Sequence, residues 1–312
     1  MPKKQTKHPA VHGAQTVSEA FATILWHNVE ALLAWQKAAK SWENIEGVHQ
    51  VRVALRRMRS ALAIFRSAIP RRYTEQWSQE MRQFASALGP ARDLDVFISE
   101  GLGPLMAQLP LPGAKPLMAV AEQHRAAAYD AVRTMLDSLE YRRFKKDFRV
   151  WLKAEGWHSA ELSEPQRRGL DADAVGFARR TLNKHLRKVL KAGRDADQDS
   201  PDELHQLRIQ CKKLRYAVEF FLPLFEGTEE FLAHMKKLQD LLGILHDVAV
   251  MPVLIDSLLI DTSLQGEADR EVHRYAGVLI GWRAREYYDL KDSFPKRWAE
   301  LARAPVPWAE NA

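Results

Sequence analysis

The sequence predicts an all-α fold made of two homologous helical bundles. Apolar residues recur at helical spacing along most of the 312-residue chain, and no segment shows a convincing alternating strand pattern. The stretch HQVRVALRRMR at residues 49–59 returns 156 positions later as HQLRIQCKKLR at residues 205–215. A second block, residues 88–96, returns at residues 242–250 with an offset of 154. Two blocks in the same order at nearly constant separation indicate one internal duplication, whose period is far longer than that of a solenoid.

The first repeat is predicted to contain six helices. Apolar periodicity and helix-breaking residues place them at residues 18–41, 48–67, 72–88, 94–108, 116–138 and 140–154. The sequence GLGP at residues 101–104 is expected to break the fourth of these helices, and PLPG at residues 110–113 is expected to form a loop. The polar segment at residues 156–170 is the predicted seam between the two repeats.

The second repeat is predicted to contain helices at residues 173–191, 201–222, 228–242, 249–259, 263–285 and 287–303. The helix at residue 201 has a clear start, because Ser200 can act as N-cap, Pro201 suits the first helical position and Glu203 can close a capping box. The predicted organisation is a basic disordered tail (1–17), a first bundle (18–155), a linker (156–172), a second bundle (173–303) and a short tail (304–312).

Each copy of the repeated stretch carries positive charge on one side of its helix. At about 100° per residue the cationic positions share an arc roughly 80° wide, separate from the apolar arc that faces a core. No acidic residue lies between Glu46 and Glu75, or between Glu203 and Glu219. A solvated helix face usually interleaves charges, because like charges repel by a few tenths of a kcal/mol per pair. Unrelieved repulsion at matching positions therefore predicts a bound polyanion.

Composition sets the broad class of the protein. The chain is 46% hydrophobic and 28% charged, with a net charge of +6, and it is long enough to bury a substantial core. Cys211 is the only cysteine, so no disulfide within the chain and no thiolate metal site can form, and a buried core thiol is expected. The basic N-terminus lacks the apolar run of a signal peptide, and the apolar stretch at residues 248–260 is too short to span a bilayer. We expect a soluble protein of the reducing cytoplasm with no membrane association.

The repeated motifs resemble those of the CHAD family, the conserved-histidine α-helical domain. Each basic stretch is followed about forty residues later by Leu-Gly-x-x-Arg/His-Asp, and the resemblance extends from about residue 18 to 303. It implies two four-helix bundles related by an approximate internal twofold, with a basic groove or pore between them. It also implies binding of inorganic polyphosphate and association with polyphosphate granules and their proteins.

The expected polyphosphate-binding residues come from both copies of the motifs. In the first repeat they are His49, Arg52, Arg56, Arg57, Arg59, Arg82 and Arg92. In the second repeat they are His205, Arg208, Lys212, Lys213, Arg215, Lys236 and His246. The first repeat relies on arginine, which holds phosphate in bidentate fashion, whereas the second uses more lysine, which acts as a point charge.

Several roles stay open at this point. His49 and His205 either contact phosphate directly or have a structural, hydrogen-bonded role. Asp93 and Asp247 would repel phosphate, so we expect a supporting structural role, with a bridging divalent ion as the alternative. Tryptophans such as Trp26, Trp35, Trp151 and Trp282 fall at core spacings, so we expect them to pack.

Catalysis is not expected. The sequence contains no nucleotide-binding P-loop, no zinc-protease motif, no hydrolase nucleophile elbow and no triphosphatase-type Glu-x-Glu-x-Lys, and it nominates no catalytic residue, metal or cofactor. Slow phosphohydrolase activity is a minor alternative. Two other functions are alternatives to polyphosphate binding. The first is nucleic-acid binding, although such a protein should interleave aromatic side chains with its cations. The second is a scaffold for an acidic protein partner, which would have the same cationic surface. The preferred chain length and the oligomeric state stay open.

Overall fold

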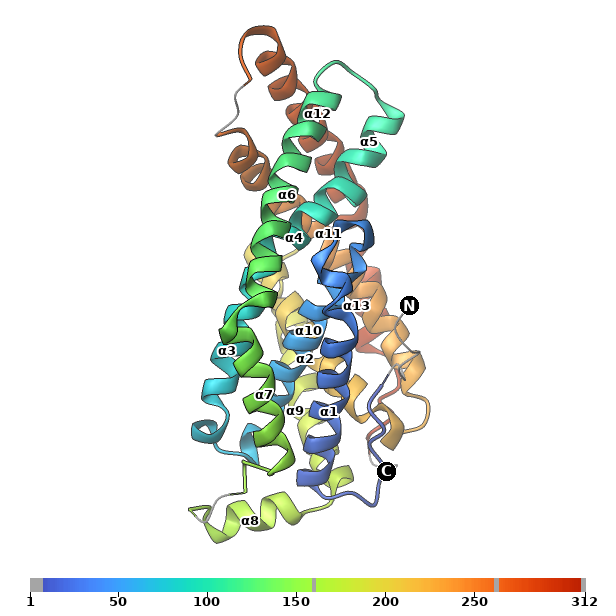
Figure 1. The fold of residues 1–312 in the computed structure, drawn as a ribbon. Coiled ribbons are helices and arrows are strands. Elements are labelled where there is room, and N and C mark those ends of the chain that lie inside the picture. Colours follow the sequence, from blue (N-terminus) through green and yellow to red (C-terminus); the bar gives the residue numbers. More distant parts are fainter. Residues whose placement is uncertain (1–7, 159–160, 261–263, 310–312) are drawn as a thin grey trace.

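The computed structural model describes residues 8–158, 161–260 and 264–309, and the prediction of an all-α fold is confirmed there. These ranges contain no strand, and a single isolated bridge joins Thr16 to Asp173. The longer helices run lengthwise along an elongated molecule (Figure 1).

The first half of the chain folds into a series of helices joined by short turns. They are α1 (Val17–Trp35), α2 (Glu46–Ile64), α3 (Glu75–Ala87), α4 (Gly89–Val96), the π-helix η5 (Phe97–Leu102), α5 (Gly103–Gln108), α6 (Ala114–Asp137) and α7 (Leu139–Lys153). Four short 3₁₀ helices lie between them: η1 (Ala38–Lys40), η2 (Trp42–Asn44), η3 (Phe65–Ser67) and η4 (Arg71–Tyr73). A capping box of Thr16 and Glu19 starts α1, and the Ser138 hydroxyl caps α7.

The second half contains fewer and longer helices. They are α8 (Glu164–Asp171), α9 (Ala174–Asp195), α10 (Pro201–Phe221), the 3₁₀ turn η6 (Leu222–Leu224), α11 (Thr228–Leu259), α12 (Gly266–Lys291) and α13 (Phe294–Ala302). Ser200 caps α10 as predicted, since its hydroxyl accepts the Glu203 N–H at 3.4 Å. The Glu203 carboxylate does not complete a capping box; it accepts the backbone N–H of Asp197 at 2.7 Å.

Three predicted boundaries were wrong. Residues 101–104 do not break the chain's helical course, because η5 runs directly into α5. The helices predicted at 228–242 and 249–259 form the single helix α11, with Pro252 inside it. The predicted linker contains α8. In α11 the buried positions continue through Met251, Ile255 and Leu258, and tertiary packing of that face stabilises the helix despite the missing N–H of proline.

A large hydrophobic cluster joins residues from both halves of the chain. At its centre the ring of Phe65 stacks on Phe177 at 4.8 Å and lies 5.0 Å from Phe21 and 5.8 Å from Phe221. A smaller cluster forms where α5, α6, α11 and α12 pack together. The sole cysteine, Cys211, is buried in the large cluster, as expected.

The described parts of both predicted tails are packed against the protein. Residues 1–7 and 310–312 lie outside the described residues, but Val11 is 1% exposed and Trp308 is fully buried. The Val17 N–H donates to the Ala172 carbonyl at 2.9 Å, and the Trp308 indole donates to the Asn183 side chain at 3.1 Å. Both segments carry apolar side chains that the core buries, so they do not behave as solvated tails where they are described.

The tryptophans mostly pack as predicted. Trp26, Trp35 and Trp151 are partly buried against the large cluster, whereas Trp282 is 47% exposed and does not fit the prediction. By length and composition alone, one described helix, α11, could cross a membrane, with a mean hydropathy of 1.7 over a window of which 33% is buried. The core helix of a soluble protein meets the same criteria.

Candidate functional site

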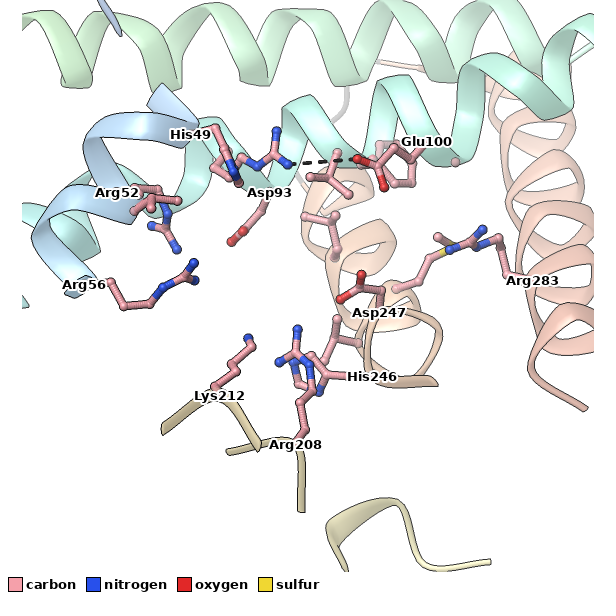
Figure 2. A pocket seen from close by; sticks show the side chains of 18 residues that line it. His49, Arg52, Arg56, Asp93, Glu100, Arg208, Lys212, His246, Asp247 and Arg283 are labelled. Carbon is pink, nitrogen blue, oxygen red and sulfur yellow. Dashed lines mark ion pairs between the residues drawn. The ribbon is translucent and has the colours of Figure 1, made fainter. Parts of the chain in front are cut away.

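Helices α2, α4, α10, α11 and α12, together with η5, surround a cavity of about 550 Å³ that we call the basic cavity (Figure 2). Its polar lining consists of His49, Arg52, Arg56, Arg92, Asp93, Glu100, Arg208, Lys212, His246, Asp247 and Arg283. Its apolar lining consists of Val53, Val96, Phe97, Gly101, Val250, Met251 and Leu254. Six cationic side chains therefore share this space with three carboxylates, which leaves the site positive even with neutral imidazoles.

The α2 side of the basic cavity presents Arg52 and Arg56. Arg52 Nη1 donates a hydrogen bond to the Ala85 carbonyl at 2.7 Å, which fixes the guanidinium. A side chain at Gly89 would place its Cβ 3.1 Å from this same nitrogen, so glycine leaves room for Arg52. The Arg56 guanidinium lies 5.5 Å from the ring centroid of Tyr216 on α10, a cation–π contact that connects the two basic helices.

The α10 side presents Arg208 and Lys212. Arg56, from α2, and Lys212, from α10, point into the same open space (Figure 2). Burial, followed by the charges of Arg208 and Arg56, lowers the pKa of Lys212 to about 8. The protein thus holds several cations together at a cost in free energy, and an anion between them would relieve that cost.

Three arginine nitrogens in the site are buried without a hydrogen-bond acceptor. Among the described residues, the Nε atoms of Arg56, Arg208 and Arg283 have no partner. A buried donor without an acceptor costs about 1–3 kcal/mol. All three atoms belong to side chains that line the basic cavity, so a ligand rich in oxygen acceptors suits it.

The histidines divide between the basic cavity and its edge. Burial, then Arg208, lowers the pKa of His246 to about 4, and burial, then Arg92, lowers the pKa of His49. Both imidazoles are therefore neutral near pH 7. His205 does not line the basic cavity; its Nδ1 lies 3.2 Å from Nδ1 of His246, and the two rings pack at 4.7 Å.

Asp93 and Asp247 both line the basic cavity beside the basic helices. Both carboxylates face the basic cavity (Figure 2). Burial raises the pKa of each, and the largest opposing effect comes from Arg52 on Asp93 and from Arg208 on Asp247. Asp93 also keeps a large exposed surface, because its carboxylate faces the open space of the basic cavity. Where both partners line the basic cavity, the ion pair is that of Glu100 with Arg92, at 3.9 Å.

Arg57 and Arg215 lie outside the basic cavity, where both form ion pairs with the same carboxylate. Glu219 forms ion pairs with Arg57 on α2 and with Arg215 on α10, the latter at 3.0 Å. Arg215 also donates to the Gln239 side chain on α11 at 2.8 Å. These two arginines connect helices rather than face the basic cavity.

The remaining predicted residues are scattered. Arg59 extends the cationic face of α2 beyond the basic cavity, and Arg82 lies close enough to lower its pKa, after the larger effect of burial. Lys213 is exposed, and Lys236 forms an exposed ion pair with Asp240 at 3.0 Å. Seven of the predicted residues thus line the basic cavity, and seven lie outside it.

Arg283 and Glu100 line the site but were not predicted. Arg283 comes from α12, outside both motif copies, and forms an ion pair with Glu286 at 2.5 Å. Glu100 belongs to the π-helix η5, within the helix predicted at residues 94–108 and just before its predicted break at residues 101–104. Among the described residues, no group of three or more histidine, cysteine or acidic side chains is arranged to hold a metal ion.

Comparison with known proteins identifies the family. The family model for the CHAD domain matches residues 23–256. The chain belongs to the CHAD domain family. This family is associated in general with polyphosphate binding. The crystal structure of the CHAD domain from the plant Ricinus communis is 26% identical in sequence and superposes with a TM-score of 0.81, covering 98% of both chains.

The chain is also similar to another solved structure and to two uncharacterised proteins. The structure of PptA from Streptomyces chartreusis is 15% identical, with a TM-score of 0.67 over 91% of this chain and 100% of that one. Two uncharacterised proteins from two Mycobacterium tuberculosis strains are each 27% identical over 236 residues. The match spans 74% of this chain but only 44% of those relatives, less than half their length.

Proposed function

We propose that this protein binds inorganic polyphosphate in the basic cavity. The observation that carries the proposal is the convergence of Arg52, Arg56, Arg208 and Lys212, from two helices distant in sequence, on one space. A polyphosphate chain carries negative charge on every phosphate and has no bases, so it needs repeated cations rather than base-reading groups. Positions three or four apart on a helix lie about 5–6 Å from one another, so successive side chains can reach neighbouring phosphates.

The two sides of the basic cavity would hold phosphate differently. The arginines of α2 and α4 can donate two parallel hydrogen bonds to one phosphate, whereas Lys212 supplies a compact charge. Release of counterions from the polyanion should supply much of the affinity and make it sensitive to salt, as it does for nucleic acids. We expect the arginines of α2 and α4 to bind phosphate more tightly than the α10 side, where Lys212 lies beside Arg208.

The proposal includes the predicted duplication. α2 with α4, and α10 with α11, would be corresponding parts of two four-helix bundles related by an approximate twofold. The matched relations of Arg52 with Asp93 and of Arg208 with Asp247 support this arrangement. The basic cavity would then be a groove between the two repeats, and one continuous polyanion would contact both.

The proposed role is binding rather than catalysis. The side chains of the basic cavity supply positive charge and hydrogen-bond donors, and the charged imidazoles that acid catalysis would need are disfavoured by burial and neighbouring arginines. We further propose that the protein acts in the cytoplasm, on polyphosphate granules, through the granule polymer itself and with granule proteins as further partners.

A calorimetric titration with long-chain polyphosphate tests the function. Replacement of Arg52, Arg56, Arg208 and Lys212 by glutamate should abolish binding, while circular dichroism should report unchanged helix content. Competition with RNA, DNA and inositol hexakisphosphate separates polyphosphate from other anions. Unchanged affinity in the folded variant, or stronger binding of nucleic acid than of polyphosphate by the wild type, would overturn the proposal.

A further inference from the structure

Helix α9 carries a second row of cations that the basic cavity does not use. Arg180, Lys184, Arg187 and Lys191 follow one another at spacings of four, three and four residues, and all four are exposed. At about 100° per residue they fall within an arc roughly 60° wide. We call these four residues the α9 stripe.

The α9 stripe has no acidic relief within its helix. No Asp or Glu occurs between Asp173 and Asp195, and among the described residues no carboxylate forms an ion pair with any of the four side chains. Like charges at these spacings destabilise a helix by a few tenths of a kcal/mol per pair. Such an uncompensated row is unusual for a merely solvated face, which interleaves signs.

Further cations extend this positive surface toward α10. Lys184 and Lys188 of α9 and Lys213 of α10 all lie near His185, where they add to burial in lowering the pKa of this imidazole to about 4. α9 packs directly on α10, the helix that also supplies Arg208 and Lys212 to the basic cavity. Helix α10 therefore contributes cations both to the basic cavity and to the positive surface around the α9 stripe.

The chemistry of the α9 stripe selects a polyanion without bases or lipid tails. Among the described residues, the large apolar side chains that are exposed all lie on other segments, so α9 offers no anchor for a bilayer and no aromatic platform for a base. A shallow hollow on α9 is lined by Arg180, Asn183, Lys184 and Arg187 and also by Leu186 and Leu190, so amide and cationic donors lie beside two apolar side chains there. Donors of this kind suit consecutive phosphates.

We infer that the α9 stripe is a second binding surface for polyphosphate, which holds the part of a long chain that extends beyond the basic cavity. This inference rests on the proposed function of the basic cavity. It predicts that affinity grows with polymer length beyond what the basic cavity can contact, because the second contact is intramolecular once the first has formed.

The test compares two matched triple variants. Lys184→Gln, Arg187→Gln and Lys191→Gln remove three charges from α9. Lys146→Gln, Arg149→Gln and Lys153→Gln remove three from α7 at the same spacing, all from exposed positions. On α7 the cations are interspersed with acids, and Asp147 pairs with Arg143 at 3.3 Å, so α7 serves as the control.

The α9 variant should bind tripolyphosphate like the wild type but bind long-chain polyphosphate about tenfold or more weakly. The slope of log affinity against log salt for the long chain should fall by about 2, since each neutralised phosphate contributes roughly 0.7. The inference fails if long-chain affinity is unchanged, if the α7 variant loses as much, or if the α9 variant loses only binding to vesicles of anionic lipid. A wild type that binds neither phosphate probe would instead refute the proposed function.

Discussion

Replacing Lys212 with methionine should raise stability and lower affinity at the same time. Burial among cations lowers the pKa of Lys212 from 10.5 to about 8. Each pKa unit corresponds to about 1.4 kcal/mol, so keeping the ammonium charged costs at most about 3.5 kcal/mol, and water in the open cavity reduces this to about 1–2 kcal/mol. Lys212→Met keeps the apolar stem and removes the charge. Its free energy of unfolding at pH 7 should therefore rise by about 1–2 kcal/mol.

The same substitution should weaken polyphosphate binding about tenfold or more, since a hydrogen bond to a charged group contributes about 1.5–3 kcal/mol. Urea unfolding and calorimetric titration measure the two effects. The wild type should gain stability between pH 8 and 10.5, because the folded protein has the lower pKa and releases the proton first, whereas the variant should not gain it. Lys115→Met, at an exposed position of α6, is the control. A Lys212→Met variant that is less stable, or that binds as tightly as the wild type, would refute the reasoning.

Three further substitutions probe neighbouring features. Burial and Arg208 hold the pKa of His246 at about 4. Bound phosphate should raise this pKa, so the polyphosphate affinity of the wild type should increase as pH falls from about 8 to 6. In His246→Asn the affinity should depend less on pH, as titration at each pH would show. Gly89→Ala would place a methyl 3.1 Å from the Arg52 guanidinium and should weaken binding severalfold, whereas Gly243→Ala meets no atom within 4 Å and should bind normally in the same assay. Glu219→Gln leaves two partly buried arginines without their shared carboxylate, and denaturant unfolding should show a loss of about 1–3 kcal/mol; no loss would mean that these ion pairs do not stabilise the fold.

Helical periodicity, together with the repeated stretch and its lack of acidic residues, predicted the central residues of the candidate site. Arg52 and Arg56 share one face of α2, and Arg208 and Lys212 share the corresponding face of α10, each separate from the buried face. A residue's direction from its helix depends only on local geometry, so the sequence specifies it. Arg57 points away from this face and meets a glutamate 162 residues later in the chain, a contact that depends on tertiary packing.

The predicted helix breaks failed where burial outweighs local preference. Gly101 and Pro252 both suggest an end to a helix, yet the chain continues helically past each. Their neighbours Leu102 and Met251 are both buried in the smaller hydrophobic cluster, and this packing stabilises the helical course. Arg283 escaped prediction for a related reason, since only the packing of α12 beside α11 brings it to the basic cavity.

The most direct test of the basic cavity is the salt dependence of long-chain polyphosphate affinity in the wild type and in the variant that carries glutamine at positions 52, 56, 208 and 212. Four cations fewer should lower the slope of log affinity against log salt by about 3, together with a large loss of affinity. Equal slopes and equal affinities for the two proteins would contradict polyphosphate binding in this cavity.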